Sequence, residues 1–217
     1  MQLQVAPSIL SADFAELGKD IRMLNNCADL IHLDIMDGIF VPNISFGFPV
    51  VEAIAKVAEK PMDTHLMIVE PWKYVERFAT VGVNMLSFHY EAALGRTSET
   101  LSMIRSFGMK AGLVINPNIP VDVLFPYLGE LDYVLLMSVF AGFGGQKFIE
   151  STYGRIMDLK KRIAQEGLDV PIEVDGGVGP SNAAALEEAG AGILVAGSSV
   201  FRAEDPEAAI KAMRQRI

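Results

Sequence analysis

Residues 30–38 read LIHLDIMDG, an apolar run that ends at an Asp-Gly turn and carries a histidine and a carboxylate two positions apart. Alternate side chains of a strand point to opposite faces, so His32, Asp34 and Met36 share one face. Burying an imidazole and a carboxylate together costs several kcal/mol unless they are paired or bind a metal. We therefore expect a cation or a substrate to stabilise this end of the strand.

Apolar runs of the same kind recur along the chain, and segments with a helical pattern separate them. The eight runs are residues 3–10, 30–36, 62–68, 85–89, 110–115, 133–139, 171–174 and 192–196. The helical segments are residues 14–25, 50–59, 72–80, 97–107, 121–128 (interrupted by Pro126), 151–166, 181–189 and a last helix that starts at Asp205 and Pro206. Continuous apolar strands between helices predict an α/β fold with a parallel sheet, closed as a TIM (β/α)8 barrel. A doubly wound sheet is the alternative, but no GxGxxG motif follows the first run.

The composition fits one domain spanning residues 1–217, because 51% of the residues are apolar and 21% are charged. The net charge of −9 argues against a nucleic-acid partner, since that affinity depends on neutralising phosphates. The single cysteine, Cys27, excludes an internal disulfide and fits a reducing compartment. No signal-peptide pattern and no long apolar run occur, so we expect a cytoplasmic protein that is not a membrane partner.

Four metal-binding side chains meet if the barrel forms, because active sites of such barrels lie at the carboxyl ends of the strands. These residues are His32, Asp34, His65 and Asp175. Two imidazoles and two carboxylates form a plausible site for a divalent cation, with Zn²⁺ first and Fe²⁺, Mn²⁺ or Co²⁺ as rivals.

Neighbouring polar residues have less specific interpretations. Asp63 shares a face with His65 and is either a partner of a metal ligand or a member of a buried ion pair. His89 is interpreted as a buried core histidine, and Asp37 as a turn residue before Gly38.

Three glycine clusters follow three successive strands and predict a phosphate site, since glycine lets backbone N–H groups approach an anion. The residues are Gly142, Phe143, Gly144 and Gly145, then Gly176 and Gly177, then Gly197 and Ser198. Loops after the last two strands often bind phosphate in this architecture.

Along almost its whole length the chain resembles the ribulose-phosphate 3-epimerase family. The matching segments are PSILSADF (7–14), HLDIMDG (32–38), FVPN (40–43), HLM (65–67), MSV (137–139), GFGGQ (142–146), DGG (175–177) and GS (197–198). The resemblance implies a barrel of the ribulose-phosphate-binding type and interconversion of D-ribulose 5-phosphate and D-xylulose 5-phosphate. It also implies a small sugar phosphate as partner and a homo-oligomer.

The resemblance assigns roles to the residues named above. His32, Asp34, His65 and Asp175 would bind the metal, and Asp34 and Asp175 would be opposed acid and base in a reaction through a 2,3-enediolate. Ser8 and His65 would contact the substrate, and the glycine clusters would hold its phosphate. Three methionines would form a dry lining around the reacting carbons. They are Met36, Met67 and Met137.

The chain departs from the family at Phe140 and Ala141, where relatives carry a polar residue and a proline. Losing the proline is expected to loosen that loop, with altered affinity rather than lost chemistry. The alternatives are a D-allulose 6-phosphate 3-epimerase and a catalytically silent barrel that only binds a sugar phosphate. Orotidine-phosphate decarboxylase is disfavoured, because no lysine lies beside Asp34.

Overall fold

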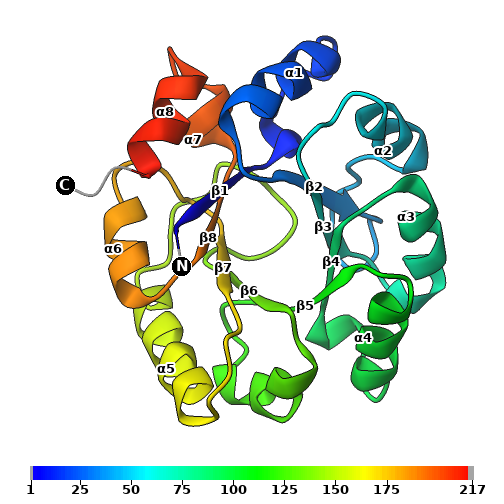
Figure 1. The fold of residues 1–217 in the computed structure, drawn as a ribbon, viewed down its shortest axis with the longest axis vertical. Coiled ribbons are helices and arrows are strands. Elements are labelled where there is room, and N and C mark those ends of the chain that lie inside the picture. The colour runs from blue at the N-terminus through cyan, green and yellow to red at the C-terminus, as the bar shows by residue number, and fades with distance from the viewer. Residues whose placement is uncertain (1, 215–217) are drawn as a thin grey trace.

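A computed structural model describes residues 2–214, which form a ring of parallel strands surrounded by helices (Figure 1). The strands are β1 (Gln4–Pro7), β2 (Ile31–Met36), β3 (Met62–Met67), β4 (Met85–His89), β5 (Lys110–Ile115), β6 (Tyr133–Met137), β7 (Ile172–Asp175) and β8 (Ile193–Ala196). The α-helices are α1 (Leu17–Cys27), α2 (Phe48–Ala55), α3 (Val75–Val81), α4 (Thr97–Ser106), α5 (Thr152–Gln165), α6 (Ala183–Ala189), α7 (Ser198–Phe201) and α8 (Pro206–Met213). The 3-10 helices are η1 (Ile9–Ser11), η2 (Pro71–Tyr74), η3 (Tyr90–Ala92) and η4 (Val121–Glu130).

The strand order is β1-β8-β7-β6-β5-β4-β3-β2, so β2 to β8 pair consecutively, β1 pairs with β8, and one seam is left between β1 and β2. At that seam Ser8, which follows β1, forms an isolated parallel bridge with His32 of β2. The bridge brings the two ends of the sheet together. The predicted TIM barrel is therefore confirmed.

The structure differs from the sequence expectation mainly where strands and helices end. The first strand is shorter than expected because Ser8 accepts a hydrogen bond from Leu10 N and starts η1. The segment with Pro126 is a 3-10 helix rather than an α-helix, and proline lacks the N–H that an α-helical turn would use. The short helix α7 after β8 was not expected.

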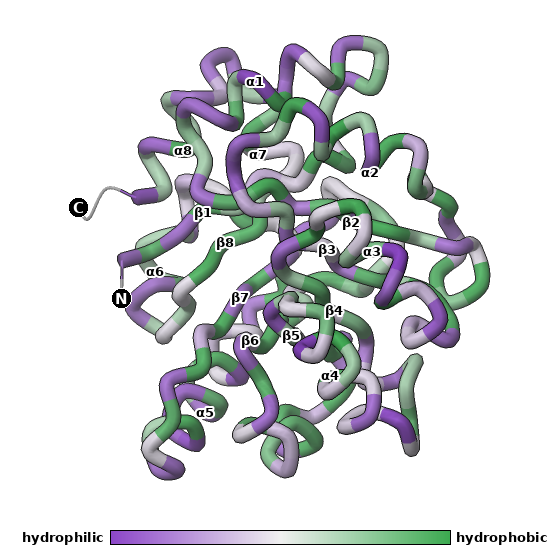
Figure 2. Tube along the Cα trace, turned by 45° about the vertical axis from the view of Figure 1, so that its right-hand side comes forward, coloured by the Kyte–Doolittle hydropathy of each residue, from purple (hydrophilic) through white to green (hydrophobic). Residues whose placement is uncertain are grey.

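Two apolar layers hold the barrel together. The larger one lies between the strands and the helices, whose residues change between hydrophilic and hydrophobic as in amphipathic helices (Figure 2). The smaller layer fills the barrel and consists of Ala6, Leu30, Met85, Tyr133, Ile193 and Val195.

Within residues 2–214, no helix combines the length and the apolar character that crossing a membrane requires.

Tyr133 crosses the barrel because Gly112, its partner on β5, has no side chain. A Cβ at Gly112 would overlap the tyrosine ring. The Tyr133 hydroxyl instead reaches Asp63 on β3, with 3.2 Å between the two oxygens. The apolar layer thus ends at the contact between Tyr133 and Asp63. Toward the carboxyl ends of the strands, ionisable side chains fill the barrel interior instead.

Candidate active site

Three successive pairs of residues across β2 and β3 build one side of the site. In register they are His32 with Asp63, Asp34 with His65, and Met36 with Met67. All six side chains are buried. Because alternate residues share a face, the two strands together present a ladder of polar groups that ends in two thioethers at the barrel mouth.

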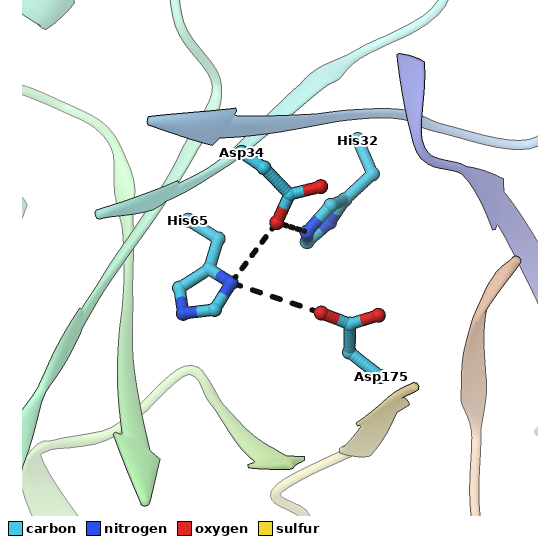
Figure 3. Close-up of side chains that lie close together, drawn as sticks. All are labelled: His32, Asp34, His65 and Asp175. Atoms are coloured by element: carbon cyan, nitrogen blue, oxygen red, sulfur yellow. Dashed lines mark ion pairs between the residues drawn. The ribbon is translucent and has the colours of Figure 1, made fainter. Parts of the chain in front are cut away.

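The four residues predicted to bind a metal lie together at this end of the barrel (Figure 3). Asp34 Oδ1 lies 3.4 Å from His32 Nε2 and 3.3 Å from His65 Nδ1. Asp175 comes from β7 on the other side of the ring, and its Oδ2 lies 3.9 Å from His65 Nδ1. One ligand atom from each residue therefore falls within 4.8 Å of all the others.

These residues fit a divalent cation. Ligands of a tetrahedral Zn²⁺ at roughly 2.0–2.1 Å from the ion are about 3.3 Å apart. The two His–Asp34 distances, 3.4 and 3.3 Å, match that spacing. In addition, His32 Nε2 and His65 Nδ1 are buried and have no hydrogen-bond partner among the described residues. Buried nitrogens without partners are costly, and a cation would satisfy both.

The two carboxylates differ in their electrostatic surroundings. Burial opposes ionisation of Asp34, but the adjoining His32 and His65 lower its pKa below the usual range. Burial and the neighbouring Asp34 carboxylate raise the pKa of Asp175 to about 7. One carboxylate is therefore ionised at neutral pH, and the other can hold a proton.

The two histidines differ as well. Burial opposes protonation of His32, but Asp34 and Asp63 raise its pKa well above the ordinary value. Burial lowers the pKa of His65 to about 4, although the Asp34 carboxylate acts in the opposite direction. His65 is therefore the neutral imidazole of the pair.

His32 is held from below by carboxyl groups. Its Nδ1 lies 2.5 Å from Asp63 Oδ2, and Glu173 Oε1 is 3.7 Å away. Asp63 also accepts the hydrogen bond from Tyr133. Both interpretations of Asp63 agree with this contact, because it is a buried ion pair with a residue that the sequence predicts to bind the metal. The contact turns His32 Nε2 toward Asp34.

His65 has a partner that the sequence analysis missed. Its Nε2 lies 2.9 Å from Nε2 of His89, the last residue of β4. The interpretation of His89 as a core histidine agrees with its burial but omits this contact. Its position two residues after Ser87, which pairs with His65 in register, is the signal that could have revealed it.

Serines orient both carboxylates. The Ser8 hydroxyl donates to Asp34 Oδ2 over 2.5 Å. The Ser138 hydroxyl shares its single proton between the backbone carbonyls of Asp175 and Gly176, at 2.8 and 2.6 Å. The first serine contacts the carboxylate itself, and the second fixes the backbone that carries the other one.

A cavity at the barrel mouth brings the expected substrate residues together. Asp34 and Asp175 line the cavity, whereas His65, which was also expected to contact the substrate, is not among the lining residues. Met36 and Met67 belong to one buried apolar cluster and Met137 to another, and Ala141 packs against both. The remaining expected residues that line it are Ser8, Gly142, Phe143, Gly144, Gly145, Gly176, Gly177, Gly197 and Ser198.

Two of the glycines have no room for a side chain. Gly176 has φ +119°, and an added Cβ would overlap Val139. Gly177 has φ +63°, and an added Cβ would lie 2.5 Å from the backbone nitrogen of Phe148. This crowding and the left-handed backbone require glycine at both positions.

The loop after β6 is restrained despite its lack of the family proline. The Ala141 N–H donates to Asn116 Oδ1 over 3.1 Å, and Asn43 donates to the Gly142 carbonyl over 2.9 Å. The Gln146 side chain donates to two further carbonyls of the loop, at 2.7 and 2.8 Å. These hydrogen bonds restrain the backbone of the loop, and the loosening expected from the sequence stays a prediction.

Comparison with known proteins identifies close relatives of the chain. The family model described as "Ribulose-phosphate 3 epimerase family" matches residues 4–201. The chain is 48% identical over 214 residues to the ribulose-phosphate 3-epimerase of Bacillus subtilis, covering 98% of each chain. It is 49% identical to the chloroplastic ribulose-5-phosphate-3-epimerase of Arabidopsis thaliana, covering 97% of this chain and 75% of that one. The Escherichia coli K12 ribulose-phosphate 3-epimerase is 41% identical, with coverages of 100% and 96%.

Solved structures of lower identity share the fold. KGPDC from Streptococcus mutans has a TM-score of 0.74 at 13% identity, over 99% of this chain and 96% of that one. The 3-hexulose-6-phosphate synthase from Salmonella typhimurium has a TM-score of 0.70 at 14% identity, with coverages of 98% and 97%. At such low sequence identity, the similarity shows a shared fold and says nothing about the reaction.

Proposed function

The chain belongs to the ribulose-phosphate 3-epimerase family, and on this premise we propose that it is a metal-dependent isomerase that epimerises C3 of D-ribulose 5-phosphate to give D-xylulose 5-phosphate. Epimerisation removes a proton from one face of the substrate and delivers another to the opposite face. The chain must therefore supply two acid–base groups on either side of one carbon.

Asp34 and Asp175 are these two groups in our proposal. They come from β2 and β7 and approach the same point from different sides of the barrel mouth. Their surroundings separate their pKa values, one lowered and the other raised to about 7. In one direction Asp34 removes the C3 proton and Asp175 delivers another, and in the reverse direction the roles exchange. The intermediate is a 2,3-enediolate.

His32, Asp34, His65 and Asp175 would hold the metal. When bound, a divalent cation there would supply Lewis-acid stabilisation of the negative charge on the two enediolate oxygens. Zn²⁺ is the cation that we propose first, since two imidazoles and two carboxylates suit it, and Fe²⁺, Mn²⁺ and Co²⁺ suit the same ligands. The observation that carries the proposal is the pair of buried histidine nitrogens that lack a partner and face Asp34.

The remaining residues bind the substrate and exclude water. The thioethers of Met36, Met67 and Met137 would cover the reacting carbons, which lowers the local dielectric and strengthens each charge interaction. Ser8 would orient Asp34 and bind a substrate hydroxyl. The three glycine clusters would receive the phosphate through backbone N–H groups.

The test follows solvent deuterium at C3 of D-ribulose 5-phosphate by NMR in D₂O. We expect the metal-loaded protein to incorporate deuterium and form D-xylulose 5-phosphate, and a chelator to stop both. We expect the Asp175→Asn variant to lose epimerisation. Asp158→Asn is the matched control, because Asp158 is exposed on α5.

Each arm can contradict one part of the proposal. Absence of deuterium incorporation by the metal-loaded protein would exclude the epimerase activity. Turnover that survives complete removal of metal would exclude the Lewis-acid role. Normal turnover by Asp175→Asn would exclude the two-faced acid–base assignment.

A D-allulose 6-phosphate 3-epimerase is the second candidate. The observation that favours it is the mouth of the cavity, where Phe140, the first of the two positions that depart from the family pattern, is 52% exposed. The same deuterium experiment with D-allulose 6-phosphate distinguishes the two substrates. A silent sugar-phosphate-binding barrel is less well supported, since it has no use for buried histidine nitrogens that lack a hydrogen-bond partner among the described residues.

We also propose a cytoplasmic homo-oligomer. Bacterial relatives and a single cysteine support the location, although the Arabidopsis relative is named as chloroplastic. Ile39 and Ile44, each 74% exposed, support the association of subunits. Measuring the size of the protein in solution tests whether the subunits associate.

A further inference from the structure

His89 and Glu91 form a polar network next to the metal-site residues, and the mechanism above does not use them. His89 is fully buried at the end of β4, and the ring of Phe40 packs 4.7 Å from it. His89 Nε2 lies 2.9 Å from His65 Nε2. Two ring nitrogens at that distance share one hydrogen bond, so one must carry the proton and the other must accept it.

The role of His65 determines which nitrogen carries the proton. To bind a cation through Nδ1, a neutral His65 must keep its proton on Nε2. His89 Nε2 is then the acceptor, and its own proton lies on Nδ1. That Nδ1 lies 3.7 Å from Glu91 Oε2, a buried oxygen with no hydrogen-bond partner among the described residues, and 3.4 Å from the side-chain nitrogen of Asn116. The charged Glu91 carboxylate attracts a proton on Nδ1 more strongly than the neutral Asn116 amide opposes it, so the His89 proton is assigned to Nδ1.

Asn116 fixes the orientation of Glu91. Its backbone N–H and its side-chain amide both donate to Glu91 Oε1, at 3.2 and 2.9 Å. The other carboxylate oxygen, Oε2, is thereby left to face His89. The amide oxygen of Asn116 accepts from the Ala141 N–H, so the network also contacts the loop after β6.

We propose that His89 and Glu91 are positioning residues that hold His65 in its Nε2-protonated tautomer and so present Nδ1 to a divalent cation. This inference rests on the proposed function, because it assigns a role to residues behind one of the proposed metal ligands. Neither residue touches the substrate in this scheme. They act through His65.

Glu91→Gln tests the proposal without changing the size of the side chain. The two Asn116 donors select the amide oxygen for the Oε1 position, so the amide NH₂ replaces Oε2 and points toward His89 Nδ1. His89 must then accept at Nδ1 and carry its proton on Nε2. Because two N–H groups cannot face each other, His65 is driven to the tautomer with its proton on Nδ1, which blocks that nitrogen.

The first measurement is the affinity of metal-free protein for Zn²⁺, by competition with a chromophoric chelator. We expect Glu91→Gln to bind Zn²⁺ 10- to 100-fold more weakly than the wild type, the range typical of removing a partner of a metal-bound histidine. Glu99→Gln is the control for the same chemical change, since Glu99 is exposed and pairs with Arg96. Thermal unfolding checks that all three proteins fold alike.

The second measurement is the tautomer itself, from ¹⁵N-histidine NMR. The chain has three histidines, so every ring can be assigned. In the metal-free proteins we expect His65 to carry its proton on Nε2 in the wild type and in Glu99→Gln. In metal-free Glu91→Gln we expect the proton on Nδ1. A merely structural role for Glu91 would leave the tautomer unchanged.

The outcomes separate this inference from the proposed function. Tight Zn²⁺ binding by the wild type together with equal affinity and an unchanged His65 tautomer in Glu91→Gln overturns the positioning role alone. Absence of Zn²⁺ binding by the wild type overturns both proposals. Weaker binding with the changed tautomer supports the positioning role.

Discussion

The two sides of the barrel mouth are built in opposite ways. The ligand side, at the ends of β2 and β3, presents His32, Asp34 and His65, each held by other side chains. The loop side, after β6, β7 and β8, is made largely of glycine and presents backbone to the cavity. The ligand side therefore depends on the chemistry of its side chains, and the loop side depends on the space around its backbone. Changing a functional group without changing size should damage the ligand side, and adding one methyl group should damage the loop side.

The largest effect is expected from Asp34→Asn, which keeps the size of the side chain on the ligand side. The amide cannot act as a base, and it binds a cation less well than the carboxylate does. We expect the epimerisation rate to fall by about 10³-fold or more. Turnover numbers from an NMR assay of D-ribulose 5-phosphate measure the loss. An unaffected rate would contradict the distinction between the two sides.

Gly177→Ala applies the opposite change to the loop side. The added methyl meets Phe148 and must adopt a left-handed backbone. We expect KM for the sugar phosphate to rise about 10- to 100-fold, with a smaller change in kcat. Gly145→Ala, at φ +73° but with no atom within 4 Å, isolates the backbone strain. Gly129→Ala, which has neither constraint, should behave as the wild type.

The pH dependence of metal binding sharpens the comparison, because Asp175 is the carboxylate that the loop side contributes. Its pKa of about 7 in the metal-free protein means that a proton occupies the group below neutral pH. A cation must displace that proton, so this group alone makes the affinity fall about tenfold for each pH unit below about 7. The raised pKa of His32 steepens this fall and extends it above pH 7, because the cation must displace the His32 proton as well. Zn²⁺ competition titrations at several pH values measure the slope, and a flat profile would contradict the assignment.

The smallest effect is expected from Ala141→Pro, which restores the family residue in the loop after β6. Proline stiffens the loop but removes the N–H that donates to Asn116. The stiffer loop stabilises the protein and the lost hydrogen bond destabilises it, each by about 1 kcal/mol or less, so the two effects oppose each other. We expect kcat/KM to change by less than about threefold. A larger gain would mean that the hydrogen bonds of the loop do not replace the proline.

The sequence was sufficient for the fold and for the residue types of the site. Eight apolar runs between helical segments predicted the barrel, because continuous apolar strands need cover on both faces. His32 and Asp34 were recognisable because ionisable residues are rare in such strands. The positions of Asp175 and the glycine clusters followed from their place at strand ends.

The partners of the ligands could not be predicted in the same way. His89 ends β4 and Glu91 follows it, and only the tilt and register of the barrel bring His89 to His65. The contact of Tyr133 with Asp63 depends on Gly112 of another strand. Such contacts join residues far apart in the chain, and no local pattern records them. The hydrogen bond from the Ala141 N–H to Asn116 could not be predicted either, because every residue except proline carries a backbone N–H.

The bridge between Ser8 and His32 has a consequence for how the barrel opens. This bridge closes the ring at the same place where Ser8 contacts Asp34, so the seam and the proposed metal site share residues. A cation held by Asp34 of β2 and Asp175 of β7 would join the two sides of this seam, so by mass action it would resist separation of β1 from β2. Amide hydrogen exchange at Asp29 and Leu30, whose N–H groups bond to the Val5 carbonyl of β1 across the seam, would then report cation occupancy from the backbone.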